Sequence, residues 1–407
     1  MRVLLFTLCY LPDAAPNASV MTTLAEGLAD LGHEVFVVTA FPHYGQNSPY
    51  VGYGGWRFKY ESFNGIRISR TPIYVGKEGS TVGKILSWLS FNLIGTWAAL
   101  KAPRVDVIIS PSPPPTLGLS DWLLSRLWRI PFIYNVQDIY PDVAIEQGLL
   151  ANPQLIALLQ KLERLVYDKA AAMTVVSDVH RARLLAKGVP PRKVVVIPNA
   201  VDTDFLRPLP RSNPWSAEQR LDGRFVVTYA GNIGVSQGLE TILDAARSLR
   251  QREHILFLVI GRGTGKSLLE AQARSRELTN IRFLPYQPRD SVPQLYASAD
   301  VHLVFLRPDV ASSFPSKTYS IMAAGRPLLA VVDGGNEVGS LVRRTNTGLV
   351  VQPKNPQALV KAILRLAHDQ ETRHRMGERA RRYVERHHSK QTVALMYDAL
   401  IRRLVTK

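Results

Sequence analysis

Three loops of this sequence carry residue types that bind phosphate groups. The first, Gly231–Gly238 (GNIGVSQG), follows the apolar run Phe225–Ala230 and precedes a helical segment. Glycine lets the backbone approach a ligand closely, and free N–H groups at the start of a helix attract anions. The same pattern is also typical of an ordinary tight turn. We expect a phosphate-binding loop whose ligand contacts are Gly231, Asn232, Gly234 and Gln237.

The second and third loops add cations. Arg262 lies in Gly261–Lys266 (GRGTGK), which lacks the glycine spacing of a P-loop. The third loop, Ser312–Pro327, places Ser316 and Lys317 just after a proline that suits a first helical turn. A cation at the positive end of a helix favours a phosphate ligand, so the pattern predicts that Arg262, Ser316 and Lys317 lie near phosphates. The alternative for Lys317 is a solvated surface cation.

Polar residues also follow the apolar strands of the first half of the chain. Gln137 and Asp138 come after the run Phe132–Tyr134, and Asn17 and Ala18 come after the first strand. Ligands of parallel sheets bind beyond the carboxyl ends of the strands. We therefore expect these four residues to line one ligand site. The alternative for Asp138 is a carboxylate that caps a turn or a helix.

The elements that must position these loops alternate between strand and helix. A chain of 407 residues is too long for one core, since cores stop growing near ~250–300 residues. The alternation predicts an α/β fold with two doubly wound, Rossmann-like domains. The predicted strands are Arg2–Thr7, Glu34–Ala40, Val105–Ser110, Phe132–Val136, Ala172–Val176, Phe225–Ala230, Ile255–Ile260, Ile281–Leu284, Val301–Phe305 and Pro327–Val331.

A proline-rich stretch with little periodicity, from Pro198 to Pro214, separates the two halves. We place the first domain at residues 1–205 and the second at residues 206–387. A terminal helix within residues 388–407 is expected to pack back on the first domain.

The order and spacing of these loops resemble those of the family 4 retaining glycosyltransferases. The resemblance rests on Gly231–Gly238 with Leu239-Glu240, on Gly261-Arg262-Gly263, on Pro315–Lys317 with Ala323–Pro327, and on Pro198–Asp202. It covers nearly the whole chain and is closest to bacterial enzymes that build O-antigen, colanic acid and capsular polysaccharides. It implies the GT-B fold, with two domains facing a central cleft, retention of anomeric configuration, no cofactor and no required metal.

The chain departs from the family pattern at several positions. Asn232 and Gln237 stand where relatives carry an Arg and a Lys for the donor pyrophosphate. Ser312 and Ser320 replace a pair of glutamates, and Gln137 replaces a histidine of many relatives. The resemblance then implies that Ser320 makes a weak, neutral hydrogen bond to the donor ribose. A small residue packed for space is the alternative for Ser320.

The implied reaction moves a hexosyl, N-acetylhexosaminyl or deoxysugar group from a nucleotide diphosphate sugar to an acceptor. Retaining transfer passes through a cationic, oxocarbenium-like sugar, and we expect Asp138, in preference to Asp142, to stabilise it or to orient the acceptor. Two other classes stay open. One is a sugar-nucleotide 2-epimerase on the same fold, and the other is a non-enzymatic basic protein that binds membranes or nucleic acid.

The net charge of +17 predicts an anionic partner. Nucleic acid is not expected, because aromatic residues do not interleave with Lys and Arg and no nucleic-acid-binding motif is present. The segment Lys84–Lys101 holds sixteen uncharged residues between two lysines, with Trp88, Phe91 and Trp97 on its apolar side. It predicts a helix in a lipid interface, with a helix buried against the first sheet as the alternative.

We therefore expect a cytoplasmic enzyme that is peripheral on the inner face of the cytoplasmic membrane and acts on a polyprenyl-linked glycan. One cysteine, Cys9, excludes an internal disulfide bond. The apolar start of the chain is too short for a signal peptide and opens a strand–helix–strand unit. His33, His387 and His388 lack the neighbours of a metal site, so no metal ligands are expected.

Overall fold

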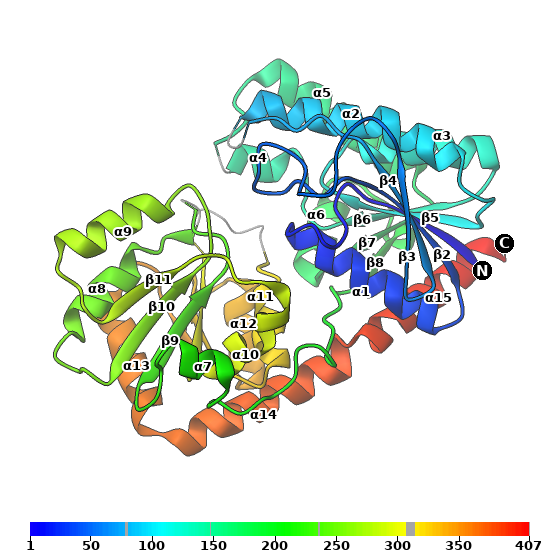
Figure 1. Ribbon diagram of the computed structural model, residues 1–407. Coiled ribbons are helices and arrows are strands. Elements are labelled where there is room, and N and C mark those ends of the chain that lie inside the picture. The colour runs from blue at the N-terminus through cyan, green and yellow to red at the C-terminus, as the bar shows by residue number, and fades with distance from the viewer. Residues whose placement is uncertain (78–79, 147, 235–236, 307–313, 407) are drawn as a thin grey trace. The chain divides into compact units, whose positions relative to one another are not determined.

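The computed structural model describes residues 1–77, 80–146, 148–234, 237–306 and 314–406. The chain divides into two compact units (Figure 1). Unit 1 comprises Met1–Ala200 and Lys390–Lys407, and unit 2 comprises Val201–Ser389. Each unit is an α/β layer structure built on its own sheet, as the alternation of apolar strands and helices predicts.

The sheet of unit 1 has the order β3-β4-β2-β1-β5-β6-β7-β8. Only the edge pair β3–β4 is antiparallel among its described pairings. Parallel neighbours need crossover connections, which the helices supply. The strands are β1 (Arg2–Phe6), β2 (Glu34–Ala40), β3 (Lys59–Phe63), β4 (Ile66–Thr71), β5 (Val107–Ser112), β6 (Phe132–Val136), β7 (Ala172–Val175) and β8 (Val194–Val196).

Helices cover both faces of this sheet. Leu4 and Phe6 of β1 pack into one core cluster, whereas Val3 and Leu5 pack into another, because successive side chains of a strand point to opposite faces. Figure 1 shows α2, α3 and α5 over one face and α1 and α15 over the other. The helical segments are α1 (Pro16–Asp30), α2 (Thr81–Leu100), α3 (Leu117–Trp128), α4 (Asp142–Glu146), α5 (Pro153–Lys169), α6 (Asp178–Ala186), η1 (Pro191–Lys193) and α15 (Lys390–Val405).

The helix α15 is separated in sequence from the rest of unit 1, yet it packs tightly against α1. His33 Nε2 lies 2.8 Å from an Asp398 carboxylate oxygen, and Lys390 pairs with Asp30 at 2.8 Å. A Cβ on Gly27 would lie 2.8 Å from the Cβ of Ala394, so the two helices need a glycine at this crossing.

The sheet of unit 2 is parallel, with the order β11-β10-β9-β12-β13-β14. Its strands are β9 (Phe225–Ala230), β10 (Ile255–Ile260), β11 (Ile281–Leu284), β12 (Val301–Phe305), β13 (Leu328–Val331) and β14 (Gly348–Val351). Its helical segments are α7 (Pro214–Glu218), α8 (Glu240–Ser248), α9 (Lys266–Ser275), η3 (Arg289–Ser291), α10 (Val292–Ser298), α11 (Lys317–Ala323), α12 (Glu337–Thr345), α13 (Pro356–His368) and α14 (Gln370–His387).

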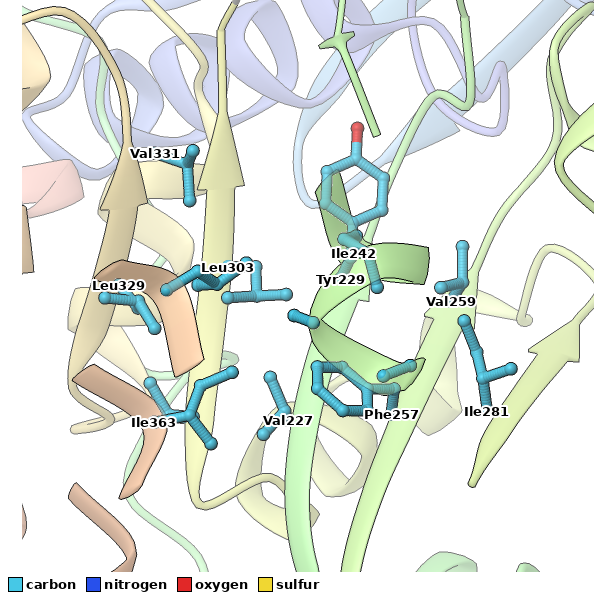
Figure 2. Close-up of a cluster of buried hydrophobic side chains, with 14 of the residues drawn as sticks. Val227, Tyr229, Ile242, Phe257, Val259, Ile281, Leu303, Leu329, Val331 and Ile363 are labelled. Carbon is cyan, nitrogen blue, oxygen red and sulfur yellow. The ribbon is translucent and has the colours of Figure 1, made fainter. Parts of the chain in front are cut away.

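Apolar side chains form two layers, one on each face of the sheet of unit 2. One layer joins the strands to α8, α9 and α13, and the other joins them to α10, α11, α12 and α14. Figure 2 shows the first layer, which includes Val227 and Phe257 of neighbouring strands and Ile363 of α13. These layers fix the strand ends from which the loops of the candidate site emerge.

One local prediction, for the segment Lys84–Lys101, is wrong. Phe91 does not lie on an exposed face of α2; it is buried and stacks on Phe6 at 5.2 Å between ring centroids. Polar residues such as Asn92 face the protein instead, where the Asn92 amide donates to the Thr116 hydroxyl at 2.6 Å.

The outer surface of α2 is nonetheless apolar. Residues at helical spacing expose their side chains, with Leu93 at 76% and Trp97 at 54%. The exposed apolar side chains of this helix are Val82, Ile85, Leu86, Leu89, Leu93, Trp97 and Leu100. No helix within the described residues is both long and apolar enough to cross a membrane.

Candidate functional site

The loops after β9 and β10 pack against each other at the carboxyl ends of the strands in unit 2. Gly231, Gly261 and Gly263 adopt φ values of +144°, +148° and +146°. A Cβ on Gly261 would lie 1.9 Å from the carbonyl oxygen of Gly231, and one on Gly263 would lie 2.4 Å from that of Ile233. Glycine is required because both the backbone angles and the packing distance exclude a side chain.

Most of the backbone N–H groups in the first loop are already used. The N–H of Gly231 donates to the carbonyl of Ile260 at 2.9 Å, and that of Ile233 donates to the carbonyl of Arg262 at 2.8 Å. The Gly234 N–H donates to the side-chain oxygen of Gln237 at 2.9 Å. In the structure the N–H groups of Gly231, Ile233 and Gly234 are therefore already hydrogen-bonded, to the end of β10, to the neighbouring loop and to Gln237.

Lys317 is the cation that stands against this loop. Its ammonium lies 3.8 Å from the ring centroid of Tyr229 and 2.7 Å from the place of a Cβ on Gly231. Burial lowers the pKa of Lys317 to about 7. No residue of the described chain accepts a hydrogen bond from this ammonium. The aromatic ring holds the cation without neutralising it, which leaves the ammonium available to an anionic ligand.

The other two cations of the region behave differently. Arg262 lies over the ring of Tyr286, with 5.0 Å from its guanidinium carbon to the ring centroid. Lys266 donates to the carbonyls of Gly261 and Leu284 at 3.2 and 3.0 Å, which ties the ends of β10 and β11 together. Lys266 therefore stabilises the ends of two strands, whereas the ammonium of Lys317 has no hydrogen-bond acceptor among the described residues.

The remaining predicted residues of unit 2 lie around Lys317. Ser316 is exposed immediately before α11, and Ser320 is half-buried one turn after Lys317. Asn232 is exposed, and its side-chain oxygen lies 2.7 Å from the place of a Cβ on Gly263. The structure thus brings Gly231, Asn232, Gly234, Gln237, Arg262 and Lys317 into one region. Ser312 lies outside the described residues.

Asp138 follows β6 at the carboxyl edge of the unit 1 sheet. Burial raises the pKa of its carboxyl group to about 6, and the positive charge of Lys84 opposes that shift. Lys84 belongs to the first turn of α2, and Trp88 of the same helix packs edge-on against Tyr140. A carboxyl group with a pKa near neutrality can accept or release a proton at physiological pH.

Gln137 is held in an amide network. Its side-chain N–H groups donate to Asn135 at 2.5 Å and to Asn199 at 2.8 Å, and its oxygen accepts from Asn199 at 2.7 Å. Asn135 in turn donates to the hydroxyl of Tyr397 in α15 at 2.9 Å. The network ties the loop before Asp138 to two distant segments. Sequence reasoning did not single out Asn135, Asn199 or Tyr397, and no local pattern marks them.

The other positions of unit 1 that the sequence singled out are Asn17, Ala18 and Asp142. Ala18 is fully buried, so its side chain has no surface for a ligand, whereas Asn17 beside it is half-buried. Asp142 forms an ion pair with Lys187 at 2.8 Å. Of the two carboxylates considered after β6, Asp142 is neutralised, whereas Asp138 forms no ion pair with any cation that the structure describes.

The described residues contain no group of three or more His, Cys, Asp or Glu side chains arranged to hold a metal ion. Unit 2 offers a half-buried cation beside a glycine loop, an arrangement that suits a diphosphate. Unit 1 offers a carboxyl group whose ionisation lies near neutrality.

Two family models cover most of the chain. Residues 18–200 match the model described as a glycosyl transferase 4-like domain, and residues 213–383 match the model described as glycosyl transferases group 1. The chain is 29% identical over 374 residues to WcaI of Escherichia coli K12, whose name assigns it to colanic acid biosynthesis as a glycosyl transferase. That alignment covers 89% of this chain and 91% of WcaI.

Solved structures share the fold at low identity. Sucrose-phosphate synthase of Thermosynechococcus elongatus aligns with a TM-score of 0.77 and 19% identity, covering 100% of this chain and 99% of that one. HepE of Anabaena, solved with UDP-glucose, aligns with a TM-score of 0.69 and 14% identity, covering 99% and 100%. WaaG, a glycosyltransferase of lipopolysaccharide biosynthesis, aligns with a TM-score of 0.68 and 16% identity, covering 99% of both chains.

Proposed function

This chain belongs to the family 4 glycosyltransferases with the GT-B fold, and on that premise we propose that it transfers a sugar, with retention, from a nucleotide diphosphate sugar to a polyprenyl-linked glycan. The proposed setting is the synthesis of a surface polysaccharide, as the name of the relative WcaI suggests. The observation that carries the proposal is the ammonium of Lys317 beside the glycine loop of β9.

Lys317 pairs with the donor diphosphate in this proposal. Relatives use an Arg and a Lys in the first loop, where this chain has the neutral residues Asn232 and Gln237. Lys317 supplies the missing charge from α11, and Arg262 adds a second cation nearby. The side-chain oxygen of Gln237 occupies the Gly234 N–H. A phosphate oxygen that replaces it gains that N–H as a donor.

The proposed reaction has three parts. The bond between the anomeric carbon and the diphosphate oxygen breaks, and its electron pair leaves with the nucleotide diphosphate, whose charge Lys317 stabilises. The acceptor hydroxyl forms the new bond on the same face of the sugar and gives its proton to an oxygen of the departing diphosphate. The ionised Asp138 stabilises the cationic sugar between these events, because a fixed negative charge is effective in a buried site.

Three further assignments complete the donor site. The hydroxyl of Ser320 binds the ribose with a neutral hydrogen bond, and Ser316 and Asn232 lie near the phosphates. We propose that no metal ion takes part, since Lys317 and Arg262 provide the positive charge that a metal would otherwise supply.

Because a polyprenyl-linked acceptor is anchored in lipid, we propose that the enzyme works at the inner face of the cytoplasmic membrane. The outer side of α2 supports this, because seven apolar side chains, from Val82 to Leu100, are exposed there. Lys101 holds its ammonium 3.6 Å from the ring of Trp97, a pairing that suits the interface between lipid and water. The net charge of +17 favours an anionic membrane surface.

A panel of UDP-, GDP- and dTDP-sugars tests the function. The cognate donor at 100 times its dissociation constant should stabilise the protein by ~2.7 kcal/mol, visible as a higher melting temperature. With that donor in radiolabelled form, label should pass to a polyprenyl diphosphate-linked sugar, and the product should keep the anomeric configuration. Release of a free epimer without transfer would instead indicate an epimerase.

A further inference from the structure

A hollow lies at the opposite sheet edge of unit 1 from Asp138. Its volume is about 540 Å³, and it lies between the segment that follows α2 and the end of α3. The strands β5 and β6 start beside it, so it stands at their amino ends and belongs to no part of the proposed catalytic site. Its lining residues are Ala102, Arg104, Leu127, Trp128 and Arg129.

Two exposed arginines, Arg104 and Arg129, line this hollow. Neither guanidinium forms an ion pair or a hydrogen bond within the part of the chain that the structure describes. A guanidinium is a planar fork of N–H donors that matches two oxygens of a phosphate. Arg129 also ends α3 with a φ of +56°, a conformation that a residue with a side chain seldom adopts.

The hollow continues into an apolar surface. Leu127 lines it and is also 62% exposed at the end of a row on α3 that includes Leu119 and Leu123 at four-residue spacing. Beside α3, the end of α2 exposes Trp97 and Leu100. Figure 1 shows the two helices next to each other on the same face of unit 1. The two arginines of the hollow are therefore adjacent to an exposed apolar surface formed by α2 and α3.

We propose that this hollow binds the phosphodiester headgroup of an anionic membrane phospholipid, with Arg104 and Arg129 on the phosphate and the α2–α3 surface among the acyl chains. The charge of the two arginines selects an anion, and the adjoining row of leucines selects one that carries a hydrophobic tail. The proposal rests on the membrane attachment proposed above and adds to it a chemical preference, for phosphate over other surface anions.

Flotation of the protein with vesicles tests this preference. Neutral phosphatidylcholine vesicles are compared with vesicles of equal negative charge, supplied either by phosphatidylglycerol or by a carboxylate lipid such as cholesteryl hemisuccinate. The wild type should bind phosphatidylglycerol vesicles best. The double variant Arg104→Gln, Arg129→Gln should lose about tenfold or more in partitioning to them, since each basic residue near an anionic surface contributes ~1 kcal/mol. Its binding should then be the same on both anionic surfaces.

The matched control is Arg57→Gln, Arg192→Gln, which removes the same charge from exposed positions elsewhere in unit 1. If both double variants lose binding equally, only net charge matters and the site is refuted. The same holds if the Arg104 and Arg129 variant keeps the preference for phosphatidylglycerol, or changes only the melting temperature, as expected of cations that merely stabilise helix ends.

Two further outcomes separate the sources of failure. If glycerol 3-phosphate raises the melting temperature of the wild type without vesicles, and Arg104→Gln, Arg129→Gln abolishes that shift, the site takes a soluble phosphate and the lipid assignment is wrong. If the wild type binds no anionic vesicle at low salt, the membrane attachment itself fails, and the glycosyltransferase activity stands or falls on the donor assay.

Discussion

Lys317 holds its ammonium 3.8 Å from the ring centroid of Tyr229, over an aromatic face that lies at the end of β9. Burial lowers the pKa of this lysine to about 7. An arriving diphosphate restores the preference for the charged form, so binding of the donor and binding of a proton are coupled at this residue.

The first prediction follows from that coupling. Lys317 is charged below pH 7 in the free protein, and a bound diphosphate raises its pKa. Donor affinity should therefore be highest below pH 7 and fall as the pH rises from 7 to 9, with uptake of a proton on binding. Isothermal titration calorimetry in buffers of different ionisation enthalpy measures both effects.

The matching variants make this prediction specific. Lys317→Met should weaken donor binding at pH 6 by about 10- to 100-fold, using ~1.5–3 kcal/mol for a hydrogen bond to a charged group. The pH dependence should also vanish. Lys361→Met, at an exposed position of α13, serves as the control. A wild-type affinity that is constant from pH 6 to 9 would exclude Lys317 from the phosphate site.

The second prediction concerns Asp138. The ionised carboxylate is the form that stabilises a cationic sugar, so turnover should rise with pH through a midpoint at about 6, where the carboxyl group titrates. Lys84 lowers the pKa of Asp138, so Lys84→Met should move the midpoint above 6. Asp138→Asn should reduce turnover by about 10² with donor affinity preserved. Turnover that stays near normal in Asp138→Asn refutes the role.

The third prediction concerns the outer face of α2. Leu89→Ser, Leu93→Ser removes two exposed apolar side chains and should lower partitioning to vesicles at least tenfold, at ~1.5–3 kcal/mol for a buried leucine. Leu268→Ser, Leu395→Ser changes two exposed leucines on other helices and should bind as the wild type does. Equal binding of both double variants would show that α2 does not contact the lipid.

The fourth prediction concerns Ser320. A neutral hydrogen bond contributes ~0.5–1.5 kcal/mol, so Ser320→Ala should raise the dissociation constant of the donor less than tenfold. Ser340→Ala, at an exposed position of α12, is the control for changes unrelated to the ribose. Comparison with the 2′-deoxyribose form of the donor adds a direct check, because the variant should no longer distinguish the two.

The fifth prediction concerns the crossing of α1 and α15. A Cβ on Gly27 would meet the Cβ of Ala394 at 2.8 Å and the carbonyl of Lys390 at 3.0 Å. Gly27→Ala should therefore lower the free energy of unfolding of unit 1 by ~1–3 kcal/mol, although alanine is the better helix former. Adding Ala394→Gly should recover part of the loss. Urea unfolding of both variants measures the change.

The strands with continuous apolar runs, such as Ile255–Ile260, are predictable from the sequence. A strand that is buried on both faces is apolar at nearly every position, and such a run is easy to recognise. The sequence did not predict β3, whose residues KYESF are mostly polar and lie at the sheet edge. Likewise, the apolar residues of β4 (IRISRT) alternate with charged and polar ones over only six positions, and this pattern is too weak to indicate a strand.

The candidate site was predictable only in part, for a physical reason. Glycine loops and cations are local features, so Gly231, Arg262 and Lys317 could be singled out. The hydrogen bonds that use the loop N–H groups come from a neighbouring loop, and Asn135 and Tyr397 are 262 positions apart. Contacts of that kind depend on the assembled sheet and leave no periodic trace in the sequence.

The location of α15 has a consequence for synthesis of the protein on the ribosome. The helix completes a face of unit 1, where Tyr397 and Ile401 join the apolar cluster of β1 and α1, yet it is translated after all of unit 2. At about 5–20 residues per second, that delay is on the order of ten to forty seconds. During this interval the nascent first unit exposes an unfilled apolar surface, which makes it a substrate for chaperones that bind such surfaces until the last helix arrives.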